Sequence, residues 1–503
     1  MHKLNPKVYY LIFALIVLVA FILRILPPVG NNFYFTMDQA NDALHVREIL
    51  AGRLLLFGPE TSIFGLYAGS LWYYFIAIGY FLFQSHPFGG VFMLILLNVF
   101  LAAIIIRRIS REISPLAGLV IGAVLLTSWG FYDLSRYSFN PFPIFFLTVV
   151  GIFWLTDFLR GNESKYILAA IPFGLFFHTD LAPAIPANVF YMGLGIISLL
   201  RRQLSPRRFL AAILVLLFFL TPHILSEFTT GFSQTHTLIK EFRDPGSVFS
   251  GSQVGQIIRS LYRQTPEIGI LGFALVLVLF FRKIQAHKVN PFVKYFIILS
   301  LSLFFLSWIF FTTNLGWRDW HTAFLSPLIF LGFLLVLTEI PTLLGAILLA
   351  VSIYSHLNIF ISRYQQNFRP TGDPSLLVNE IAAIDWVYQK SASAGFSVYS
   401  YLPSVFDYPY QYLFWWHGLS KYSYLPCEYS SFPSDPLTRL PNSYAYRTPT
   451  RACPSNLRFL IIEPDKNITN FNQWFTAISQ NTALLEESKI GLITVQKRLI
   501  LQK

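Results

Sequence analysis

Charged residues are scarce in this chain. Only 12% of its 503 residues are Asp, Glu, Lys or Arg, whereas 54% are hydrophobic and 17% are aromatic. Soluble globular domains carry about a quarter charged residues, and a domain with the present composition could not bury all its apolar surface inside itself. The scarcity of charge excludes an ordinary soluble protein and predicts a polytopic α-helical membrane protein.

Common motifs of soluble enzymes are also absent. The sequence has no P-loop, G-x-G-x-x-G, H-E-x-x-H or paired C-x-x-C, which argues against an ATP-driven pump unless a partner supplies the ATPase. We find no internal repeat of the kind that many transporters carry. The net charge of +12 comes from short basic clusters between apolar runs, not from one continuous face, so we expect no nucleic-acid partner.

These basic clusters set the expected orientation, because cytoplasmic loops are enriched in Lys and Arg. With every cluster inside, the stretch 66–83 has to stay on the outer side as a juxtamembrane or re-entrant helix. We expect a multi-pass plasma-membrane protein with a cytoplasmic N-terminus, although an endoplasmic reticulum protein would have the same topology. The clusters are Lys3/Lys7, Arg107/Arg108/Arg111, Arg160/Lys165, Arg201/Arg202/Arg207/Arg208 and Arg282/Lys283/Lys288/Lys294.

About eleven transmembrane helices follow from this orientation, since each needs roughly 20 apolar residues. They are expected at 8–26, 89–106, 115–131, 142–158, 166–178, 183–200, 208–222, 267–281, 293–311, 322–338 and 341–359.

Two domains are expected. Residues 1–360 form a transmembrane module with two long outer loops, at 27–88, which holds juxtamembrane helices, and at 223–266. Residues 361–503 form an extracytoplasmic α/β domain, because this tail contains the strand-like stretches FSVYSY, RFLIIE and IGLITVQ. Both cysteines, Cys427 and Cys453, lie in the tail, and two thiols in an exported domain predict a disulfide; two buried free thiols are the alternative.

The first outer loop carries an unusual group of charges in the sequence FYFTMDQANDALHVREILAGR. The apolar positions within residues 38–53 predict an amphipathic helix that lies in the membrane interface. Asp38 stands just ahead of that helix, where a carboxylate can cap the helix or project toward the membrane surface. Most carboxylates of the transmembrane module fall in the outer loops, so we expect any chemistry on that side.

The same loop resembles the C superfamily of glycosyltransferases, and most closely its protein O-mannosyltransferase and lipid A aminoarabinose transferase branch. The shared pattern is an outer-side Asp after the first span, a helix of the form D-[EQ]-x-x-x-A-x-x-x-R-E-[IM]-L-x-x-G, and an aromatic segment. The matching residues are Asp38, Gln39, Ala43, Arg47, Glu48, Leu50 and Gly52, followed by Trp72, Tyr73 and Tyr74.

The resemblance implies a sugar donor linked to a polyprenyl phosphate or diphosphate, and an acceptor hydroxyl of a glycan, lipid or protein that approaches from outside. Such a donor already has a good leaving group, so the enzyme mainly needs a base, positive charge for the departing phosphate, and alignment. Asp38 is the expected general base of an inverting transfer. The sequence does not identify the sugar, the acceptor or the oligomeric state.

Two departures from the family pattern leave metal dependence open. Gln39 follows Asp38 where the family usually has Glu, which weakens a metal site formed by both side chains. In the second outer loop Asn140 precedes Pro141 where relatives often carry Asp, and Asp133 could substitute for it, cap a helix or pair with Arg136. We therefore expect no certain cofactor, with a divalent metal ion as a possibility.

Further substrate-binding residues are expected where spans emerge on the outer side. Arg is favoured for phosphate because its planar fork binds two oxygens, and the alternative for each Arg is an ion pair with a nearby Asp. For the histidines and aromatic residues of the outer loops and the tail, the alternative to substrate binding is an ordinary structural role. The expected substrate-binding residues are Gln39, Asp42, Arg136, Asn140, His178, Asp180, Arg318 and Asp319.

A membrane glycosyltransferase is therefore the leading hypothesis. A lipid or sugar transporter or flippase is the main alternative, and it predicts ionisable residues near the middle of the membrane, whereas here the charges gather on one side. A third hypothesis is a scaffold whose outer domain binds partners.

Overall fold

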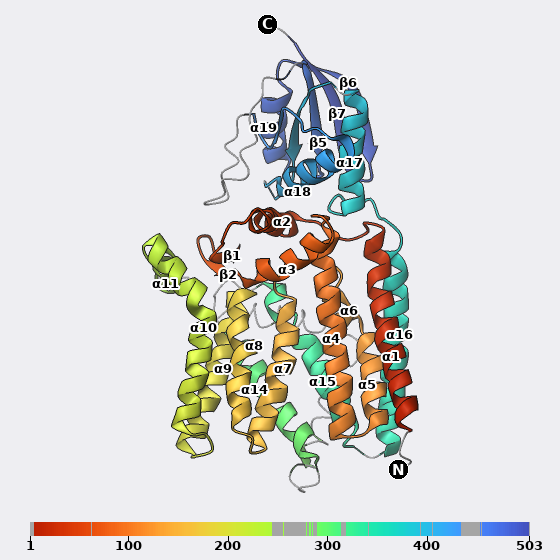
Figure 1. The fold of residues 1–503 in the computed structure, drawn as a ribbon. Helices are drawn as coiled ribbons and strands as arrows, with labels where there is room; N and C mark the ends of the chain where they lie inside the picture. Colours follow the sequence, from red (N-terminus) through yellow and green to blue (C-terminus); the bar gives the residue numbers. More distant parts are fainter. Residues whose placement is uncertain are drawn as a thin grey trace.

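The structure is a computed structural model. It describes residues 5–243, 289–312, 318–433 and 455–501, without 62, 341, 393 and 405, together with the single residues 255, 278, 281, 282, 284 and 453. A helical bundle carries a layer of short elements across one end, and a C-terminal domain lies beyond that layer (Figure 1). The N-terminus lies at the other end of the bundle.

The bundle consists of long apolar helices packed side by side (Figure 1). In the described part of the chain, seven segments are long and apolar enough to cross a membrane: α1, α4, α9, α10, α14, Trp320–Leu337 and α16. The bundle helices are α1 (Pro6–Val29), α4 (Phe88–Glu112), α5 (Pro115–Leu126), α7 (Pro143–Leu159), α8 (Ser164–Leu175), α9 (Leu181–Leu200), α10 (Pro206–Thr230), α14 (Pro291–Thr312), α15 (Leu325–Leu337) and α16 (Thr342–Asn367).

Shorter helices follow several of these spans. The span expected at 115–131 is broken, because α5 ends at Leu126. There the Thr127 hydroxyl donates to the carbonyl of Ala123 (3.1 Å) and the Ser128 hydroxyl to that of Leu125 (2.8 Å). The span expected at 267–281 lies outside the described residues apart from 278 and 281, so the number of eleven stays a prediction. The short helices are α6 (Trp129–Asp133), η1 (Phe176–His178), α11 (Ser233–Arg243) and η2 (Asp319–Thr322).

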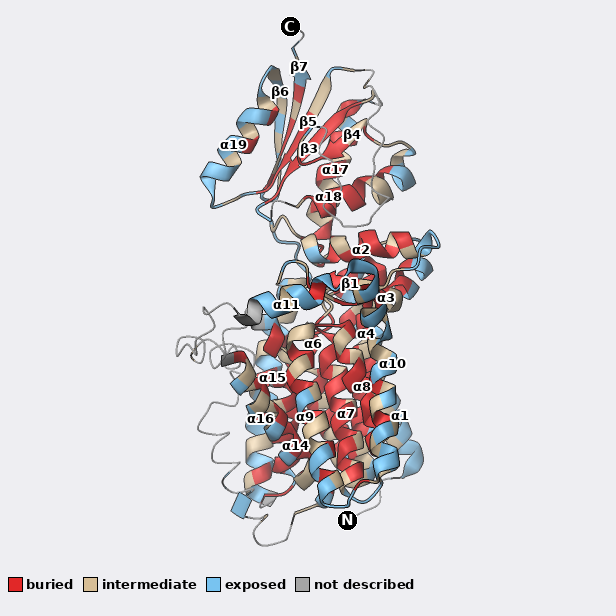
Figure 2. Cartoon of the chain, turned by 90° about the vertical axis from the view of Figure 1, so that its left-hand side faces the viewer, coloured by how far each residue is buried: buried red, intermediate tan, exposed pale blue. Residues whose placement is uncertain are grey.

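The surface of the bundle is apolar. Buried residues concentrate around α7 and α8, whereas outer helices such as α1 and α10 bury few of their side chains (Figure 2). Leu11 on α1 and Phe218 on α10 are more than two-thirds exposed. Because water would solvate such a surface poorly, it fits a hydrocarbon environment, and the chain is a multi-pass membrane protein.

Charged residues gather at the N-terminal end of the bundle. Arg160 pairs there with Glu112 (2.9 Å) and Arg208 pairs with Glu163 (2.7 Å), so these pairs connect the ends of neighbouring helices. The described basic clusters therefore share one end, opposite the C-terminal domain (Figure 1). This arrangement agrees with the expectation that all basic clusters lie on one side of the membrane. The cytoplasmic location of this end stays a prediction.

A layer of short elements covers the opposite end of the bundle. Helix α3 lies obliquely across the ends of the spans and does not cross the bundle (Figure 1). The sequence predicts this for the stretch 66–83. The helix turns back into α4 so closely that a Cβ atom on Gly79 would lie 2.1 Å from the carbonyl oxygen of Gly89. The elements are α2 (Met37–Leu50), β1 (Phe57–Glu60), β2 (Tyr67–Gly69) and α3 (Leu71–Leu82).

Helix α2 differs from the amphipathic interface helix that the sequence predicts. It lies between the bundle and the C-terminal domain (Figure 1), and both its apolar side chains, such as Leu44, and its charged side chains Asp42 and Glu48 are buried. The C-terminal domain covers the second side of the helix, where Arg47 lies 4.2 Å from the ring centre of Trp415. The interface prediction is wrong because the sequence of α2 does not reveal this second covering layer.

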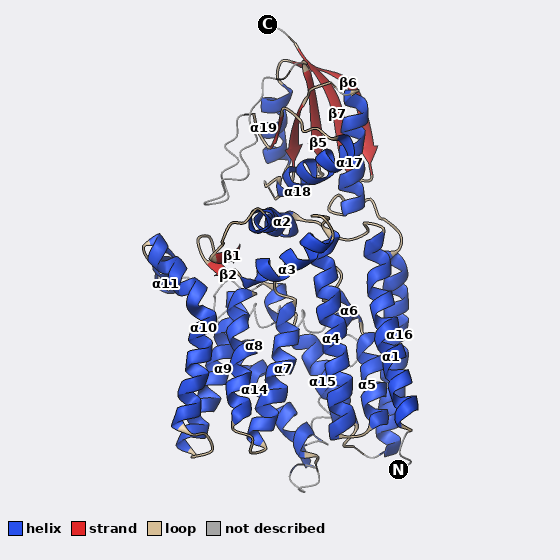
Figure 3. Cartoon of the chain, in the orientation of Figure 1, coloured by secondary structure: helices blue, strands red, loops and turns tan. Residues whose placement is uncertain are grey.

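The C-terminal domain is a five-stranded sheet with helices on both faces (Figure 3). The strand order is β4-β3-β5-β7-β6; β3 is parallel to β4 and β5, whereas β7 is antiparallel to β5 and β6. Tyr399 of β3 lies opposite Leu460 of β5. The elements are α17 (Leu377–Ser391), β3 (Ser397–Tyr401), α18 (Tyr408–Leu413), the π-helix η3 (Phe414–Tyr422), β4 (Glu428–Ser430), β5 (Leu457–Ile462), α19 (Ile468–Ser479), β6 (Thr482–Ile490) and β7 (Ile493–Ile500).

Successive side chains along the strands point to opposite faces of the sheet, so the domain has a hydrophobic core on each face. Val398 and Phe459 belong to the main hydrophobic core, which includes α17 and α18, whereas Tyr401 and Leu460 pack with Trp474 of α19. The predicted disulfide is present: Cys427 and Cys453 are bonded, with 5.4 Å between their Cα atoms. The domain boundary predicted at 360 lies inside α16, which ends at Asn367.

Candidate active site

A cavity of about 450 Å³ lies between the bundle, the layer of short elements and the C-terminal domain. We refer to it as the central cavity. Four carboxylates, two histidines and one arginine are among its lining residues. The lining residues are Met37, Asp38, Asn41, Asp42, His45, Phe57, Gly58, Pro59, Glu60, Thr61, Tyr67, Ala68, Tyr73, Phe139, Asn140, Pro141, Thr179, Asp180, Arg318, Trp320, His321, Phe406 and Tyr408.

The start of α2 positions Asp38. The Gln39 Oε1 atom accepts hydrogen bonds from the backbone nitrogen (3.0 Å) and the hydroxyl (2.6 Å) of Thr36, which precedes the helix. This contact stabilises the helix start, so Asp38 is not the cap. Gln39 is 2% exposed and does not line the cavity, and the structure gives it a capping role in place of the predicted substrate contact.

The Asp38 side chain is open to the central cavity. Within the described ranges, its carboxylate has no hydrogen-bond or ion-pair partner. The protein around the cavity wall removes water from this group, and that desolvation raises the pKa of Asp38 above 3.8. A carboxylate with free lone pairs and a raised pKa can accept a proton from a bound hydroxyl group.

Asp42 lies one helical turn after Asp38 and is almost fully buried. The Trp72 indole nitrogen donates a hydrogen bond to its Oδ2 atom (2.7 Å). Burial raises the pKa of Asp42 well above 3.8, the Trp72 hydrogen bond opposes this rise, and the nearby charge of Asp38 adds to it. Asp42 is therefore held in place by an aromatic donor and favours its protonated form.

His45 continues the same face of α2. Its Nδ1 atom donates to the carbonyl of Asn41 (2.8 Å), and its ring stacks on Tyr73 with 4.9 Å between centroids. Burial lowers the pKa of His45, so the ring is neutral and its Nδ1 proton is used within the helix. The family pattern includes Tyr73, but nothing in its spacing indicated Asn41 or His45 as a wall of the cavity.

Asp180 and Asn140 form another wall. Asp180 caps α9 by accepting from the backbone nitrogen of Ala182 (3.1 Å) through Oδ1, whereas its buried Oδ2 atom has no hydrogen-bond partner in the described part of the chain. Burial raises the pKa of Asp180 to about 7. The Asn140 amide donates to the carbonyl of Thr179. This hydrogen bond connects the segment before α7 to the segment before α9.

The segment before α15 supplies the positive charge of the central cavity. Arg318 lines it, and its backbone nitrogen donates to the Nδ1 atom of His321 (3.2 Å). The Nε2 atom of His321 lies 3.7 Å from Oδ2 of Asp180. Arg318 is thus positioned through its backbone while its guanidinium is exposed at the cavity. The side chain of Asp319 lies outside the described residues.

Two aromatic residues reach the central cavity from the C-terminal domain. Phe406 and Tyr408 stack on each other with 5.2 Å between ring centroids. They belong to the aromatic-rich tract whose sequence allows either sugar stacking or core packing. The docking of the C-terminal domain on the transmembrane module brings them to the cavity.

Two predicted site residues lie elsewhere. The Nε2 atom of His178 is hydrogen-bonded to the carbonyl of Phe219 (2.6 Å), and its Nδ1 accepts from the backbone of Leu71 (3.4 Å). His178 thus joins α10 to the layer of short elements. Arg136 pairs with Asp133 (2.9 Å) and lines a separate, smaller pocket.

The acidic side chains that the structure describes do not form an evident metal-binding group. Among the residues that the structure describes, no set of three or more His, Cys, Asp and Glu side chains is arranged to hold a metal ion. Asp38 and Asp42 are the neighbouring carboxylates that α2 offers to the cavity. The possible divalent metal therefore stays an untested prediction.

Comparisons with known proteins reveal the fold. No protein-family model matches the chain, and no curated protein matches its sequence. The crystal structure of ArnT from Cupriavidus metallidurans bound to undecaprenyl phosphate is similar with a TM-score of 0.61 at 10% identity, covering 98% of both chains. The apo structure of the same protein gives a TM-score of 0.60 with the same identity and coverage.

A further structure matches less closely. The Archaeoglobus fulgidus oligosaccharyltransferase in complex with Zn and sulfate covers 76% of this chain and 55% of its own, with 12% identity and a TM-score of 0.48, and this likeness supports no conclusion about the present chain. The likeness to ArnT extends over the bundle and the C-terminal domain together. This likeness confirms the expected fold, a polytopic helical bundle followed by a C-terminal α/β domain.

Proposed function

We propose that this chain, which has the fold of ArnT, is a membrane glycosyltransferase that moves a sugar from a polyprenyl-phosphate carrier to an acceptor hydroxyl. The central cavity carries the proposal, because it combines the guanidinium of Arg318 with the carboxylate of Asp38, which has no hydrogen-bond or ion-pair partner in the described part of the chain. The ArnT structure that shares this fold was solved with undecaprenyl phosphate bound, which supports a lipid phosphate of this class as the carrier.

Asp38 is the proposed general base. It takes the proton of the acceptor hydroxyl while the acceptor oxygen forms its bond to the anomeric carbon of the sugar. The bond between that carbon and the phosphate oxygen breaks, and the electron pair leaves with the polyprenyl phosphate. Attack opposite the leaving group inverts the anomeric centre. General base catalysis of this kind contributes about 10²–10⁴-fold to the rate.

Arg318 is the proposed partner of the departing phosphate. Its guanidinium is permanently charged and presents parallel N–H donors to two phosphate oxygens, and negative charge develops on that group as the bond breaks. The backbone hydrogen bond to His321 fixes the place of Arg318 at the cavity. The neighbouring Asp319 remains a proposed substrate-binding residue.

Asp42, Asn140 and Asp180 are proposed to position the sugar and the acceptor. Each lines the central cavity, and burial raises the pKa of both Asp42 and Asp180. A protonated carboxyl group donates a hydrogen bond as well as accepting one, so these groups suit sugar hydroxyls. The aromatic faces of Phe406 and Tyr408 suit the apolar face of a sugar ring.

The test is transfer by purified full-length protein from a panel of radiolabelled polyprenyl-phosphate sugars, with cell-envelope acceptors present. We expect wild-type protein to release polyprenyl phosphate and to label an acceptor. Asp38→Asn should lower this turnover by at least about a hundredfold, because the amide cannot accept the proton.

The matched control is Asp465→Asn, which makes the same chemical change in the C-terminal domain, where Asp465 accepts a hydrogen bond from Tyr401. This variant should turn over at the wild-type rate. Normal turnover by folded Asp38→Asn would reject Asp38 as the base. Consumption of no donor by folded wild-type protein would reject the transferase itself and favour the transporter hypothesis.

A further inference from the structure

A second, smaller pocket lies where α1, α6 and α16 end on the side of the C-terminal domain. Its volume is about 50 Å³, which holds a few water molecules or one tetrahedral phosphate group. It shares no lining residue with the central cavity. The lining residues are Arg24, Pro27, Pro28, Asn32, Phe33, Tyr34, Tyr132, Arg136, Gln366, Asn367, Arg369, Thr371 and Leu376.

This pocket is strongly positive. Three guanidinium groups line it, those of Arg24, Arg136 and Arg369, whereas no carboxylate does. Arg363 adds a fourth charge next to it, because Arg363 and Arg136 lie over the same Trp129 ring, at 5.4 and 5.2 Å from its centre. Within the described ranges, the one ion pair of these four arginines joins Arg136 to Asp133.

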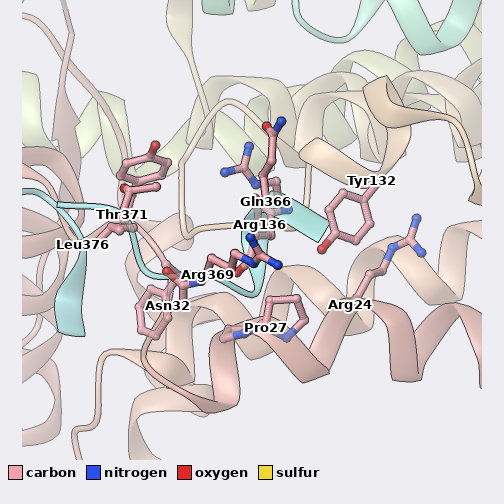
Figure 4. Close-up of a pocket in the computed structure, with 13 residues that line it drawn as sticks. Arg24, Pro27, Asn32, Tyr132, Arg136, Gln366, Arg369, Thr371 and Leu376 are labelled. Atoms are coloured by element: carbon pink, nitrogen blue, oxygen red, sulfur yellow. Dashed lines mark hydrogen bonds between the residues drawn. The ribbon is translucent and has the colours of Figure 1, made fainter. Parts of the chain in front are cut away.

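The central arginines can reach an anion together. Arg136 and Arg369 lie near the middle of the group, with Arg24 and Tyr132 at one end and Thr371 at the other (Figure 4). Arg24 is 1% exposed, and its hydrogen bonds run to neutral acceptors, among them Asn98 (2.8 Å). Arg24 therefore contributes positive potential, while the exposed Arg369 supplies free donors.

Like charges held this close repel each other, and the repulsion is strong where water is limited. A bound anion removes it and accepts several charge-assisted hydrogen bonds at once. A phosphate fits best, because its tetrahedral oxygens match two guanidinium forks. The amides of Asn32 and Gln366 and the hydroxyl of Thr371 are further possible donors at the same pocket.

The place of the pocket indicates where such a phosphate comes from. Helices α1 and α16 have few buried residues along their apolar stretches, so they lie on the lipid-facing side of the bundle. Arg24 and Asn367, which line the pocket, belong to α1 and α16. The ends of these two helices lie beside the layer of short elements (Figure 1). Lipid head groups occupy this depth of a bilayer, where the hydrocarbon ends.

We propose that this pocket binds the phosphate group of a membrane lipid, through Arg136 and Arg369 with the neighbouring polar side chains. The site is separate from the central cavity and does not depend on the proposed transferase activity. It assigns the phosphate contact expected of Arg136 to a second site. A bound lipid would join α1, α6 and the end of α16, just before the chain enters the C-terminal domain.

The test is native mass spectrometry of delipidated full-length protein titrated with phosphatidylglycerol. We expect one tightly bound lipid in the wild type, and at least tenfold weaker binding in Arg369→Gln and in the double variant Arg136→Gln/Arg369→Gln. The single variant should fold normally, because Arg369 is exposed and has no ion pair among the described residues. Diacylglycerol, which lacks the phosphate, should not occupy the site.

The matched control is Arg201→Gln/Arg207→Gln, which removes two exposed charges at the other end of the bundle and should bind lipid like the wild type. A parallel measurement of the unfolding temperature with inorganic phosphate distinguishes the two sources. Stabilisation by phosphate that disappears in Arg369→Gln, with unchanged lipid binding, would identify a site for the free ion. Equal lipid binding and equal stabilisation by phosphate in all variants would overturn the proposal.

Discussion

Asp180 has one buried carboxylate oxygen, Oδ2, with no hydrogen-bond partner in the described chain. Its burial raises the pKa to about 7, so the folded protein binds this proton more tightly than the unfolded chain does. The contribution of Asp180 to stability is complete below about pH 4, and it is lost as the pH rises from about 4 to 7. Above pH 7 the folded state holds a buried charge.

Asp180→Asn should therefore stabilise the protein at high pH. The amide cannot ionise, yet Asn caps a helix as well as Asp does. We expect the unfolding temperature of the variant to exceed that of the wild type by at least about 3 °C at pH 8, with a much smaller difference at pH 5. Differential scanning fluorimetry in detergent measures both.

Asp465→Asn is the control for this comparison, because hydrogen bonds, first from the backbone of Asn467 and then from Tyr401, outweigh desolvation and lower the pKa of Asp465. The difference between this variant and the wild type should not change from pH 5 to pH 8. If the unfolding temperatures of Asp180→Asn and wild-type protein differ by the same amount at pH 5 and pH 8, the assigned titration of Asp180 is wrong.

At the scale of elements, the contact between α3 and α4 determines where the layer of short elements lies. The two helices approach so closely at Gly79 and Gly89 that neither position has room for a side chain. This close approach brings Trp72 on α3 next to Asp42 on α2. A small displacement of α3 would therefore move a wall of the central cavity.

Gly79→Ala should lower both stability and turnover, because the new methyl group would lie 2.1 Å from the Gly89 carbonyl oxygen and the helices would have to separate. We expect a destabilisation of about 1–3 kcal/mol, seen as a lower unfolding temperature. Gly193→Ala is the control, since no atom lies within 4 Å of its added Cβ and alanine favours a helix. Equal unfolding temperatures for the two variants would contradict the packing argument.

At the scale of the whole molecule, the C-terminal domain is docked on the transmembrane module through specific hydrogen bonds. The Tyr412 hydroxyl donates to the carbonyl of Ser85 (2.6 Å), and the Trp416 indole donates to that of Gln84 (3.3 Å). Both carbonyls belong to the turn between α3 and α4. The same docking places Phe406 and Tyr408 at the central cavity.

Tyr412→Phe should loosen this docking without unfolding the domain. The loss of one hydrogen bond across the interface costs about 1 kcal/mol, so local opening should become roughly fivefold more frequent. Hydrogen exchange measured by mass spectrometry should be faster in peptides that cover 83–88 and 408–422. Tyr422→Phe is the control, because its hydroxyl donates to Asp385 within the same domain, and it should leave exchange at 83–88 unchanged. Unchanged exchange at 83–88 in Tyr412→Phe would show that other contacts hold the domain.

Much of the architecture follows from local properties of the sequence. Apolar length and the basic clusters predict most of the spans, and the alternating tail predicts strands β3, β5 and β7, because both patterns depend on the nearest neighbours along the chain. The disulfide was predicted differently, from the presence of both cysteines in a domain expected to be exported. The predicted α/β domain and the polytopic bundle are both present.

The composition of the central cavity was only partly predictable. Asp38, Asp42, Asn140, Asp180 and Arg318 line it, as the outer-loop argument leads one to expect. Gln39, His178 and Arg136 do not, because each is engaged by a partner close by: a helix start, a neighbouring helix and Asp133. Short polar motifs look alike in sequence whether they bind a substrate or another part of the chain.

The sequence by itself determined that this chain enters a membrane, that most of its long apolar segments are helices, and that a domain with strands follows them. Those properties depend on the transfer of apolar groups from water and on local backbone preferences. The tertiary structure alone decided that α2 is buried on both sides, that aromatic residues near position 406 complete the cavity of Asp38, and that three arginines distant in the chain share a second pocket. Such contacts join residues up to several hundred positions apart, and their free energies depend on packing and desolvation that arise only when the elements come together.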